Sequence, residues 1–142
     1  MAIKIRFRFD YLGIGKAGKI FGKKSIEQIA EETRQHKVAL LRNVPNQGIR
    51  IEDIDMSSEV YTVYDDVSRK EIAYAPVFVT ISADNIEDAL KFSMKEEFRT
   101  VIVLEPEEVS LSKAEVERIL YKASEELHEY KEYLLKRINN LS

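Results

Sequence analysis

The regular spacing of apolar residues near the C-terminus is the feature that most constrains the fold of this chain. Six residues recur at alternating intervals of four and three, which is the spacing of a helix that pairs with another helix. We name this set the C-terminal stripe, and it consists of Val116, Leu120, Ala123, Leu127, Tyr130 and Leu134. A capping box at Ser112 and Glu115 precedes it. The pattern predicts a helix from Ser112 to about Ile138, roughly 40 Å long at about 1.5 Å per residue.

A helix of that length extends beyond the strands beside it, which are usually about 17 to 20 Å long. A monomer of this size does not expose a long apolar stripe without consequence. We therefore expect the C-terminal stripe to be the interface of a symmetric homodimer. The alternatives are a helix that lies diagonally across its own sheet and a helix that breaks near Ser124.

The N-terminal residues alternate between apolar and basic side chains. The odd positions from Ile3 to Phe9 are apolar, whereas the even positions hold Lys4, Arg6 and Arg8. This period of two predicts a strand with one buried face and one basic, solvated face.

A second capping box, Ser25 with Gln28, predicts a helix from Ile26 to about His36. The short apolar run at residues 38–41 ends in a turn rich in Asn, Pro and Gly, and it predicts a second strand. Residues 59–64 and 71–81 are predicted to form a hairpin, and residues 100–104 a further strand. A helix is predicted from Asp84 or Asn85 to about Glu97. Residues 49–56 fit no single pattern.

The order of these elements is that of a ferredoxin-like α+β sandwich with an inserted strand and a long C-terminal helix appended. We expect residues 1–142 to form a single α+β domain, in which residues 112–140 are the long helix that mediates dimerisation. Many unrelated functions use this architecture, so the fold alone does not specify one.

The composition excludes several classes of protein. The chain has no cysteine, which removes disulfides, thiolate nucleophiles and cysteine-ligated zinc and fits a reducing compartment, so we expect a cytoplasmic protein. No apolar run approaches the roughly 20 residues that cross a bilayer, and no membrane association is expected. The high content of Lys, Arg and Glu favours a thermophilic source.

The sequence contains no specific catalytic signature. There is no G-x-S-x-G motif, and neither of the two histidines stands in a recognised catalytic setting. The acidic clusters at residues 52–55 and 105–108 lack the EF-hand pattern. We therefore predict no catalytic residue, no metal site and no cofactor, and the sequence favours a non-catalytic protein over an enzyme.

The charge is distributed unevenly along the chain. Residues 1–50 contain 11 Lys and Arg against 4 Asp and Glu, whereas residues 51–142 contain 11 against 21. The basic strand is followed by a G-x-G-x-x-G pattern, and the backbone N–H groups of such a loop can bind phosphate. In dinucleotide-binding folds the helix begins within this pattern, whereas here the next predicted helix begins later, at Ser25. The candidate residues for binding a ligand or nucleic acid are Lys4, Arg6, Arg8, Gly13, Gly15, Lys16, Gly18, Lys19, Lys23 and Lys24. Tyr11 and Phe21 lie in the same region as candidates for stacking on bases.

These observations rank three functional hypotheses. The first is a non-catalytic regulatory or protein-interaction module that forms a homodimer through the C-terminal stripe. The second is a protein that binds nucleic acid or a phosphorylated ligand through the basic strand and the glycine-rich and lysine-rich loop. A pI near 5.5 opposes this second hypothesis, because an acidic protein repels a polyanion unless its basic residues segregate on one surface. The third is an enzyme of unknown reaction, which requires a deep pocket with convergent polar side chains.

Overall fold

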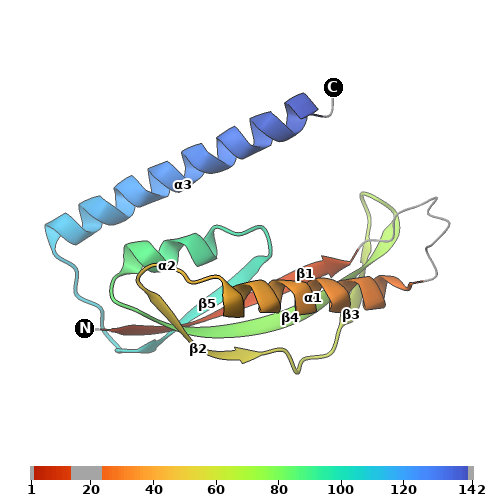
Figure 1. Cartoon of the computed structure of the whole chain (residues 1–142), viewed down its shortest axis with the longest axis horizontal. Coiled ribbons are helices and arrows are strands. Elements are labelled where there is room, and N and C mark those ends of the chain that lie inside the picture. The colour runs from red at the N-terminus through yellow and green to blue at the C-terminus, as the bar shows by residue number, and fades with distance from the viewer. Residues whose placement is uncertain (1, 14–23, 141–142) are drawn as a thin grey trace.

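The computed structural model describes residues 2–13 and 24–140, which form a five-stranded antiparallel sheet and three helices, the last of them long (Figure 1). Along the chain the elements are β1 (Ile3–Gly13), α1 (Ile26–Asn43), β2 (Ile49–Asp55), β3 (Tyr61–Asp65), β4 (Lys70–Ala83), α2 (Ile86–Ser93), β5 (Phe98–Glu105) and α3 (Lys113–Asn140).

The strand order is β2-β4-β1-β5, and β3 pairs with the other end of β4. Residues 78–83 of β4 pair with β2, whereas residues 70–74 pair with β3. The edges β2 and β3 therefore follow one another along the same side of β4. The predicted hairpin of β3 and β4 is confirmed, and the ambiguous residues 49–56 contain the strand β2.

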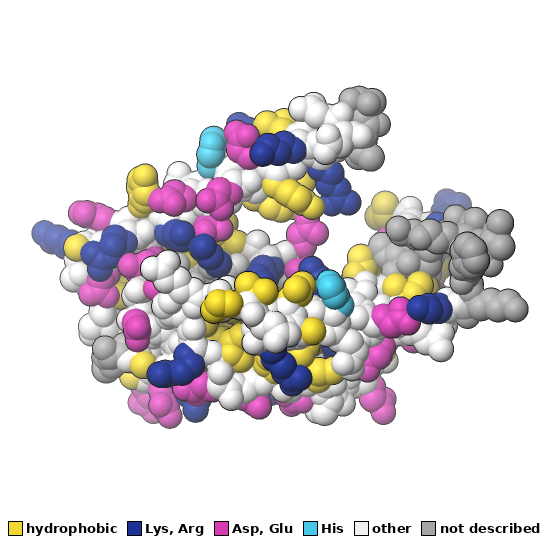
Figure 2. Space-filling model, in the orientation of Figure 1, with side chains coloured by type: hydrophobic (Ala, Val, Ile, Leu, Met, Phe, Trp, Pro, Cys, Tyr) yellow, Lys and Arg dark blue, Asp and Glu magenta, His cyan; other side chains and the backbone are white. Residues whose placement is uncertain are grey.

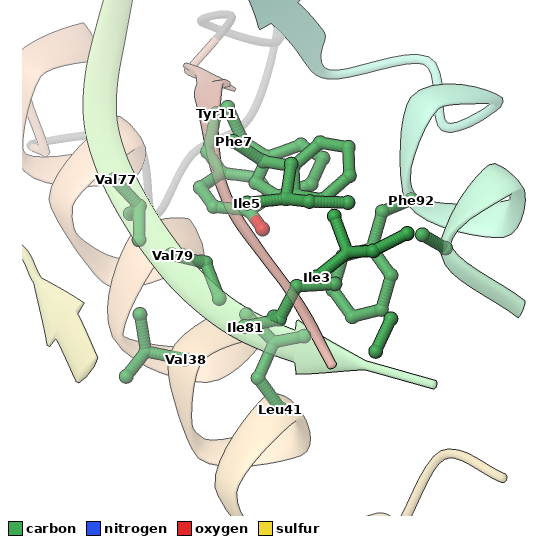
Figure 3. Close-up of a cluster of buried hydrophobic side chains, with 13 residues drawn as sticks. Ile3, Ile5, Phe7, Tyr11, Val38, Leu41, Val77, Val79, Ile81 and Phe92 are labelled. Atoms are coloured by element: carbon green, nitrogen blue, oxygen red, sulfur yellow. The ribbon is translucent and has the colours of Figure 1, made fainter. Parts of the chain in front are cut away.

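The core lies between one face of the sheet and the helices α1 and α2 (Figure 3). The odd-numbered side chains of β1 point into it, as their alternation predicts. Phe92 of α2 lies against Phe7 and Phe9, with ring centroids 5.3 and 6.2 Å apart. Each fully buried phenylalanine contributes about 1.5–3 kcal/mol through the water-exposed area that it loses. The opposite face of the sheet has no helix packed on it among the described residues (Figure 1), and we name it the open face.

Helix α1 is longer than predicted and includes residues 38–41, which the sequence pattern assigned to a strand. That prediction is wrong because Val38 and Leu41 continue the buried side of the helix, at helical spacing from Ala30 and Arg34. The helix ends at Asn43 because Val44 precedes a proline and adopts extended backbone angles. The capping box of Ser25 and Gln28 is confirmed.

Helix α2 is shorter than predicted. Asn85 is its N-cap and accepts a hydrogen bond from the backbone N–H of Asp88 at 2.9 Å. The helix ends at Ser93 rather than near Glu97, because residues 94–97 form the turn that leads into β5. The backbone N–H of Phe98 closes this turn by donating to the carbonyl of Lys95 at 3.1 Å.

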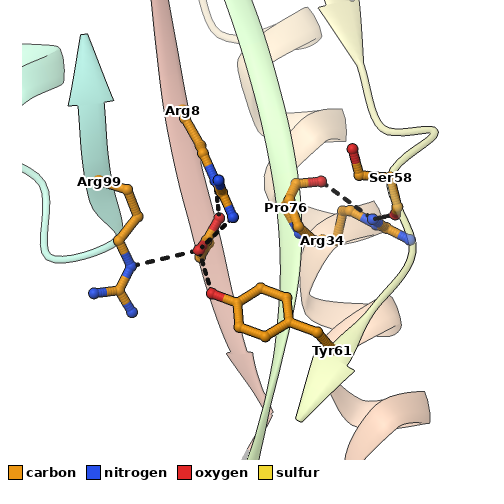
Figure 4. A network of polar contacts seen from close by, with 7 residues as sticks. Arg8, Arg34, Ser58, Tyr61, Pro76 and Arg99 are labelled. Atoms are coloured by element: carbon orange, nitrogen blue, oxygen red, sulfur yellow. Dashed lines mark hydrogen bonds and ion pairs between the residues drawn. The ribbon is translucent and has the colours of Figure 1, made fainter. Parts of the chain in front are cut away.

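Arg34 fixes α1 to the edge of the sheet where β2 gives way to β3. Arg34 is 4% exposed, and its side chain donates to the carbonyls of Ser58 and Pro76 at 2.7 and 3.1 Å (Figure 4). Pro76 has no N–H to donate, and it lies between the residues of β4 that pair with β3 and those that pair with β2. The proline therefore costs the sheet no hydrogen bond, and Arg34 pairs with its carbonyl instead.

Gly13 ends β1 where the strand meets the first turns of α1. A side-chain carbon at this position would lie only 2.8 Å from the Cα of Ala30, and closer still to backbone atoms of Ala30 and Ile26. The neighbouring atoms belong to the backbone and cannot move away cheaply. The structure thus gives Gly13, a predicted ligand-binding residue, a packing role.

Candidate functional site

Helix α3 lies against α2 and extends well past it (Figure 1). At about 1.5 Å per residue, the 28 residues of α3 span about 42 Å and the 8 residues of α2 about 12 Å. Arg118 donates to Glu87 at 3.0 Å, and the hydroxyl of Tyr130 donates to Glu96 at 3.0 Å. No residue of α3 is buried. The helix is also unbroken at Ser124 and lies on α2 rather than across the sheet, so neither alternative arrangement is found.

The C-terminal stripe lies on the exposed surface of α3, except at Ala123, which is half-buried. Leu120 and Leu127 are 66% and 64% exposed, and the other three members are 36–41% exposed. The half-buried residues of α3 include Ile119 and Glu126, which lie outside the stripe, together with Ala123 of the stripe. Figure 2 shows hydrophobic side chains on α3 and open space beneath its C-terminal half. Contact with α2 and the turn after it therefore covers one edge of the stripe, at Ala123 and Tyr130, and leaves Leu120 and Leu127 largely exposed.

Strand β5 is a second exposed apolar element. It pairs with β1 on one side, and no other described strand pairs with it. Its four central apolar residues are exposed, and they are Val101, Ile102, Val103 and Leu104. An exposed apolar stretch of this kind on an edge strand promotes association with other chains unless it is covered.

The basic residues of β1 lie together on the open face, as their alternation predicts. Each is paired with a carboxylate: Lys4 with Glu52 at 3.4 Å, Arg6 with Asp55 at 3.9 Å and Arg8 with Asp10 at 2.9 Å. The open face is therefore closer to neutral than the sequence of β1 suggests.

The other candidate binding residues do not join this group within the described residues. Lys24 lies beside the start of α1 and pairs with Glu32 at 2.8 Å. Tyr11 is 3% exposed in the core, so it cannot stack on a base. Five candidates from the loop, namely Gly15, Lys16, Gly18, Lys19 and Lys23, lie outside the described residues, as does Phe21.

Asp10 is the centre of a polar cluster on the open face, and its partners Arg8, Tyr61 and Arg99 are labelled in Figure 4. Its carboxylate belongs to a residue that is only 3% exposed. It accepts hydrogen bonds from Arg8 at 2.9 and 3.2 Å and from the hydroxyl of Tyr61 at 2.5 Å, and Arg99 lies 3.6 Å away. The hydrogen bond to Asp10 raises the pKa of Arg8. Burial, followed by the hydrogen bond to Asp10, raises the pKa of Tyr61.

Aromatic rings lie beneath the guanidinium groups of this cluster. Arg6 and Arg8 lie over Phe78, at 4.6 and 5.7 Å from the ring centroid. Arg99 lies 4.9 Å from the centroid of Tyr74, which stacks on Tyr61 at 5.5 Å. The sequence patterns did not identify Asp10, Tyr61, Tyr74, Phe78 or Arg99 as site residues, because strands far apart in the sequence contribute them.

The described residues contain no group of three or more His, Cys, Asp or Glu side chains arranged to hold a metal ion. A hollow of about 640 Å³ lies between the end of α1 and β2, lined by residues that include Val44, Ile51 and Ile54. Within residues 2–13 and 24–140, no helix combines the length and the hydropathy that a bilayer-spanning segment needs.

Comparison of the chain with protein-family models, with curated proteins and with solved structures finds no match. The candidate functional surfaces of the described residues are the C-terminal stripe and the open face.

Proposed function

We propose that the protein is a non-catalytic interaction module that works as a homodimer joined through the C-terminal stripe. We also propose that its body is a ferredoxin-like sandwich, with β2 and β3 together taking the place of one edge strand. The strand order, with β1 and β4 central and two helices on one face, supports that assignment.

The observation that carries the dimer is the exposure of Leu120 and Leu127 in the stripe, on a helix whose contacts with its own subunit reach only the edge of the stripe. The spacing of four and three is typical of helices that pack against a second helix. A second copy of the chain offers a stripe of the same length and chemistry, which is the condition for a symmetric interface. Exposed apolar patches of this extent mark interaction surfaces in soluble proteins.

The side chains within the stripe favour an antiparallel pair with its two-fold axis near Leu127. In a parallel pair, each residue faces its own copy, so small Ala123 would meet Ala123, and the two Arg137 side chains, which continue the spacing, would repel one another. In an antiparallel pair with this axis, Ala123 lies opposite residue 131 of the second copy, beside the large Tyr130, and the two Arg137 side chains lie at opposite ends. The antiparallel pair therefore fills space better and separates like charges.

Charge substitution in the stripe tests the dimer. Glutamate at position 127 or 134 places a charge in an apolar interface, which costs several kcal/mol, so Leu127→Glu and Leu134→Glu are expected to be monomers by sedimentation velocity. Tyr121→Glu is the matched control, because Tyr121 is 69% exposed on α3 but lies off the stripe. Dimers that survive both stripe substitutions would place the interface elsewhere.

Disulfide formation tests the orientation, since the chain has no cysteine of its own. In the antiparallel pair, the two copies of residue 134 lie about 14 residues apart along the helix, or about 21 Å, beyond the roughly 7 Å that a disulfide spans between Cα atoms. Leu127→Cys is expected to cross-link to its own copy, and Leu134→Cys only to Leu120→Cys in a mixture of the two. Efficient cross-linking of Leu134→Cys to its own copy would indicate a parallel pair. That result would contradict the antiparallel orientation but not dimerisation through the stripe.

A further inference from the structure

We propose that a hollow beside Tyr11 binds a small aliphatic carboxylate, with Lys95 and the Tyr11 hydroxyl holding the carboxylate group. The hollow has a volume of about 230 Å³ and lies between α1, the end of β1 and the turn of residues 94–97. Pockets for drug-sized molecules measure roughly 300–1,000 Å³, so this hollow suits a smaller ligand. No residue of the C-terminal stripe lines it, and the proposal does not depend on dimerisation.

The turn that forms one wall of the hollow is tied to both of the other walls. The carbonyl of Glu97 accepts a hydrogen bond from the backbone N–H of Asp10 on β1 at 2.9 Å. The carboxylate of Glu97 lies 3.4 Å from the ammonium group of Lys37 on α1. The three walls are therefore held together before a ligand arrives, which lowers the entropic cost of binding.

The hydroxyl of Tyr11 is an unpaired donor at the hollow. Tyr11 is only 3% exposed, and its hydroxyl makes no hydrogen bond with another described residue. Among the described side chains, the unpaired polar atoms that are shut off from water are the Nε of Arg6 and the Oε1 of Glu126. The Tyr11 hydroxyl is not one of them, so it is reached through the hollow that its ring lines. Burial, followed by the charge of Glu97, raises the pKa of Tyr11, so the hydroxyl stays protonated and can donate.

Lys95 supplies a positive charge at the rim of the same hollow. Its ammonium group lies 5.3 Å from the ring centroid of Phe92, and none of the ion pairs among the described residues includes it. Burial lowers the pKa of Lys95, whereas Glu97 opposes this shift and Lys37 adds to it. A carboxylate ligand gives this partly desolvated ammonium group the partner that it lacks.

The charges around the hollow match one carboxylate. Lys37 and Glu97 are paired and offset one another, so the two lysines and one glutamate of the lining leave one positive charge, that of Lys95. A carboxylate carries one negative charge. A phosphate monoester carries about 1.5 to 2 at pH 7, and its excess charge would face Glu97. The balance therefore favours a carboxylate over a phosphate.

Apolar side chains at the end of α1 line the rest of the hollow. Leu40 and Val44 are 45% and 53% exposed, and Leu41 lies between them at 8%. An aliphatic chain in the hollow removes apolar surface from water, and each methylene that it buries contributes about fourfold to affinity. The ligand is therefore expected to join a carboxylate to a short aliphatic chain, as hexanoate does.

Titration of the ¹⁵N-labelled protein with hexanoate tests this site by NMR. Hexanoate is expected to shift the backbone amide resonances of Leu41, Lys95 and Glu97. Butanoate, which is two methylenes shorter, and 1-hexanol, which has no charge, are each expected to bind at least about tenfold more weakly. The proposal fails if hexanoate shifts none of these resonances, or if 1-hexanol binds as tightly as hexanoate.

Three variants assign the binding to named groups. Lys95→Gln removes the charge and is expected to lose about tenfold or more in affinity for hexanoate, and Tyr11→Phe, which removes only the hydroxyl, about fivefold. Lys70→Gln is the matched control, because Lys70 is an exposed lysine of β4 that does not line the hollow, and it is expected to bind normally. Equal losses for Lys70→Gln and Lys95→Gln would overturn the assignment, as would full affinity in Tyr11→Phe together with Lys95→Gln. Thermal unfolding is expected to show that all three variants are folded, since Tyr11→Phe keeps the buried ring and both lysines are exposed.

Discussion

Replacing Asp10 with alanine is expected to destabilise the protein by about 2–3 kcal/mol. The carboxylate is almost wholly buried, and it is the acceptor for two hydrogen bonds from Arg8 and one from Tyr61. Breaking a fully buried ion pair costs about 3–5 kcal/mol, because the remaining charge is left unpaired. The Arg8 side chain is 35% exposed and regains water as a partner, so the loss is expected to be smaller than that range.

Urea unfolding followed by circular dichroism measures this loss. With a denaturant slope of about 2 kcal/mol per M, the urea midpoint is expected to fall by roughly 1 to 1.5 M. Asp53→Ala is the matched control, because Asp53 is an exposed carboxylate on β2, and its midpoint is expected to stay near that of the native chain. A shift for Asp10→Ala no larger than that of the control would refute the view that the cluster stabilises the open face.

Three further changes test the fold. Phe92→Ala empties a fully buried site between α2 and β1, and it is expected to cost about 3–5 kcal/mol in urea unfolding. Gly13→Ala places a methyl group against the backbone of Ala30, so a lower melting temperature is expected, and an unchanged one would contradict the close approach. Burial raises the pKa of Tyr11 in the folded protein. The contribution of the protonated Tyr11 side chain to stability is therefore complete below the ordinary tyrosine pKa near 10, and it is lost as the pH rises through the higher folded-state pKa. Tyr11→Phe is therefore expected to lose less stability than the native chain between pH 9 and strongly alkaline pH.

Local patterns predicted the elements that depend on neighbours in the sequence. The alternation of β1 predicted which of its residues face the core and which face solvent, because side chains alternate between the two faces of any strand. The capping residues Ser25 and Ser112 gave the starts of α1 and α3 for a similar reason, since a cap acts within one turn. Residues 38–41 were misassigned because a short apolar run fits a buried strand and a buried helix turn equally well.

The cluster on the open face could not be predicted, since it depends on strand register. Asp10 and Tyr61 meet only because β4 pairs with both β1 and β3, with Ala75 opposite Tyr11 and Tyr74 opposite Tyr61. Arg99 joins them at a register shift between β1 and β5. A single sequence carries no local signal for such pairings. The same limit applies to the carboxylates that neutralise Lys4 and Arg6, because they lie on β2.

The mass of the protein in solution, measured by light scattering at low and at high salt, tests the central claim most directly. The account predicts a species of twice 16.5 kDa at both salt concentrations, because an apolar interface is not screened by ions. A species of 16.5 kDa at concentrations where the C-terminal stripe should be paired would contradict dimerisation through α3.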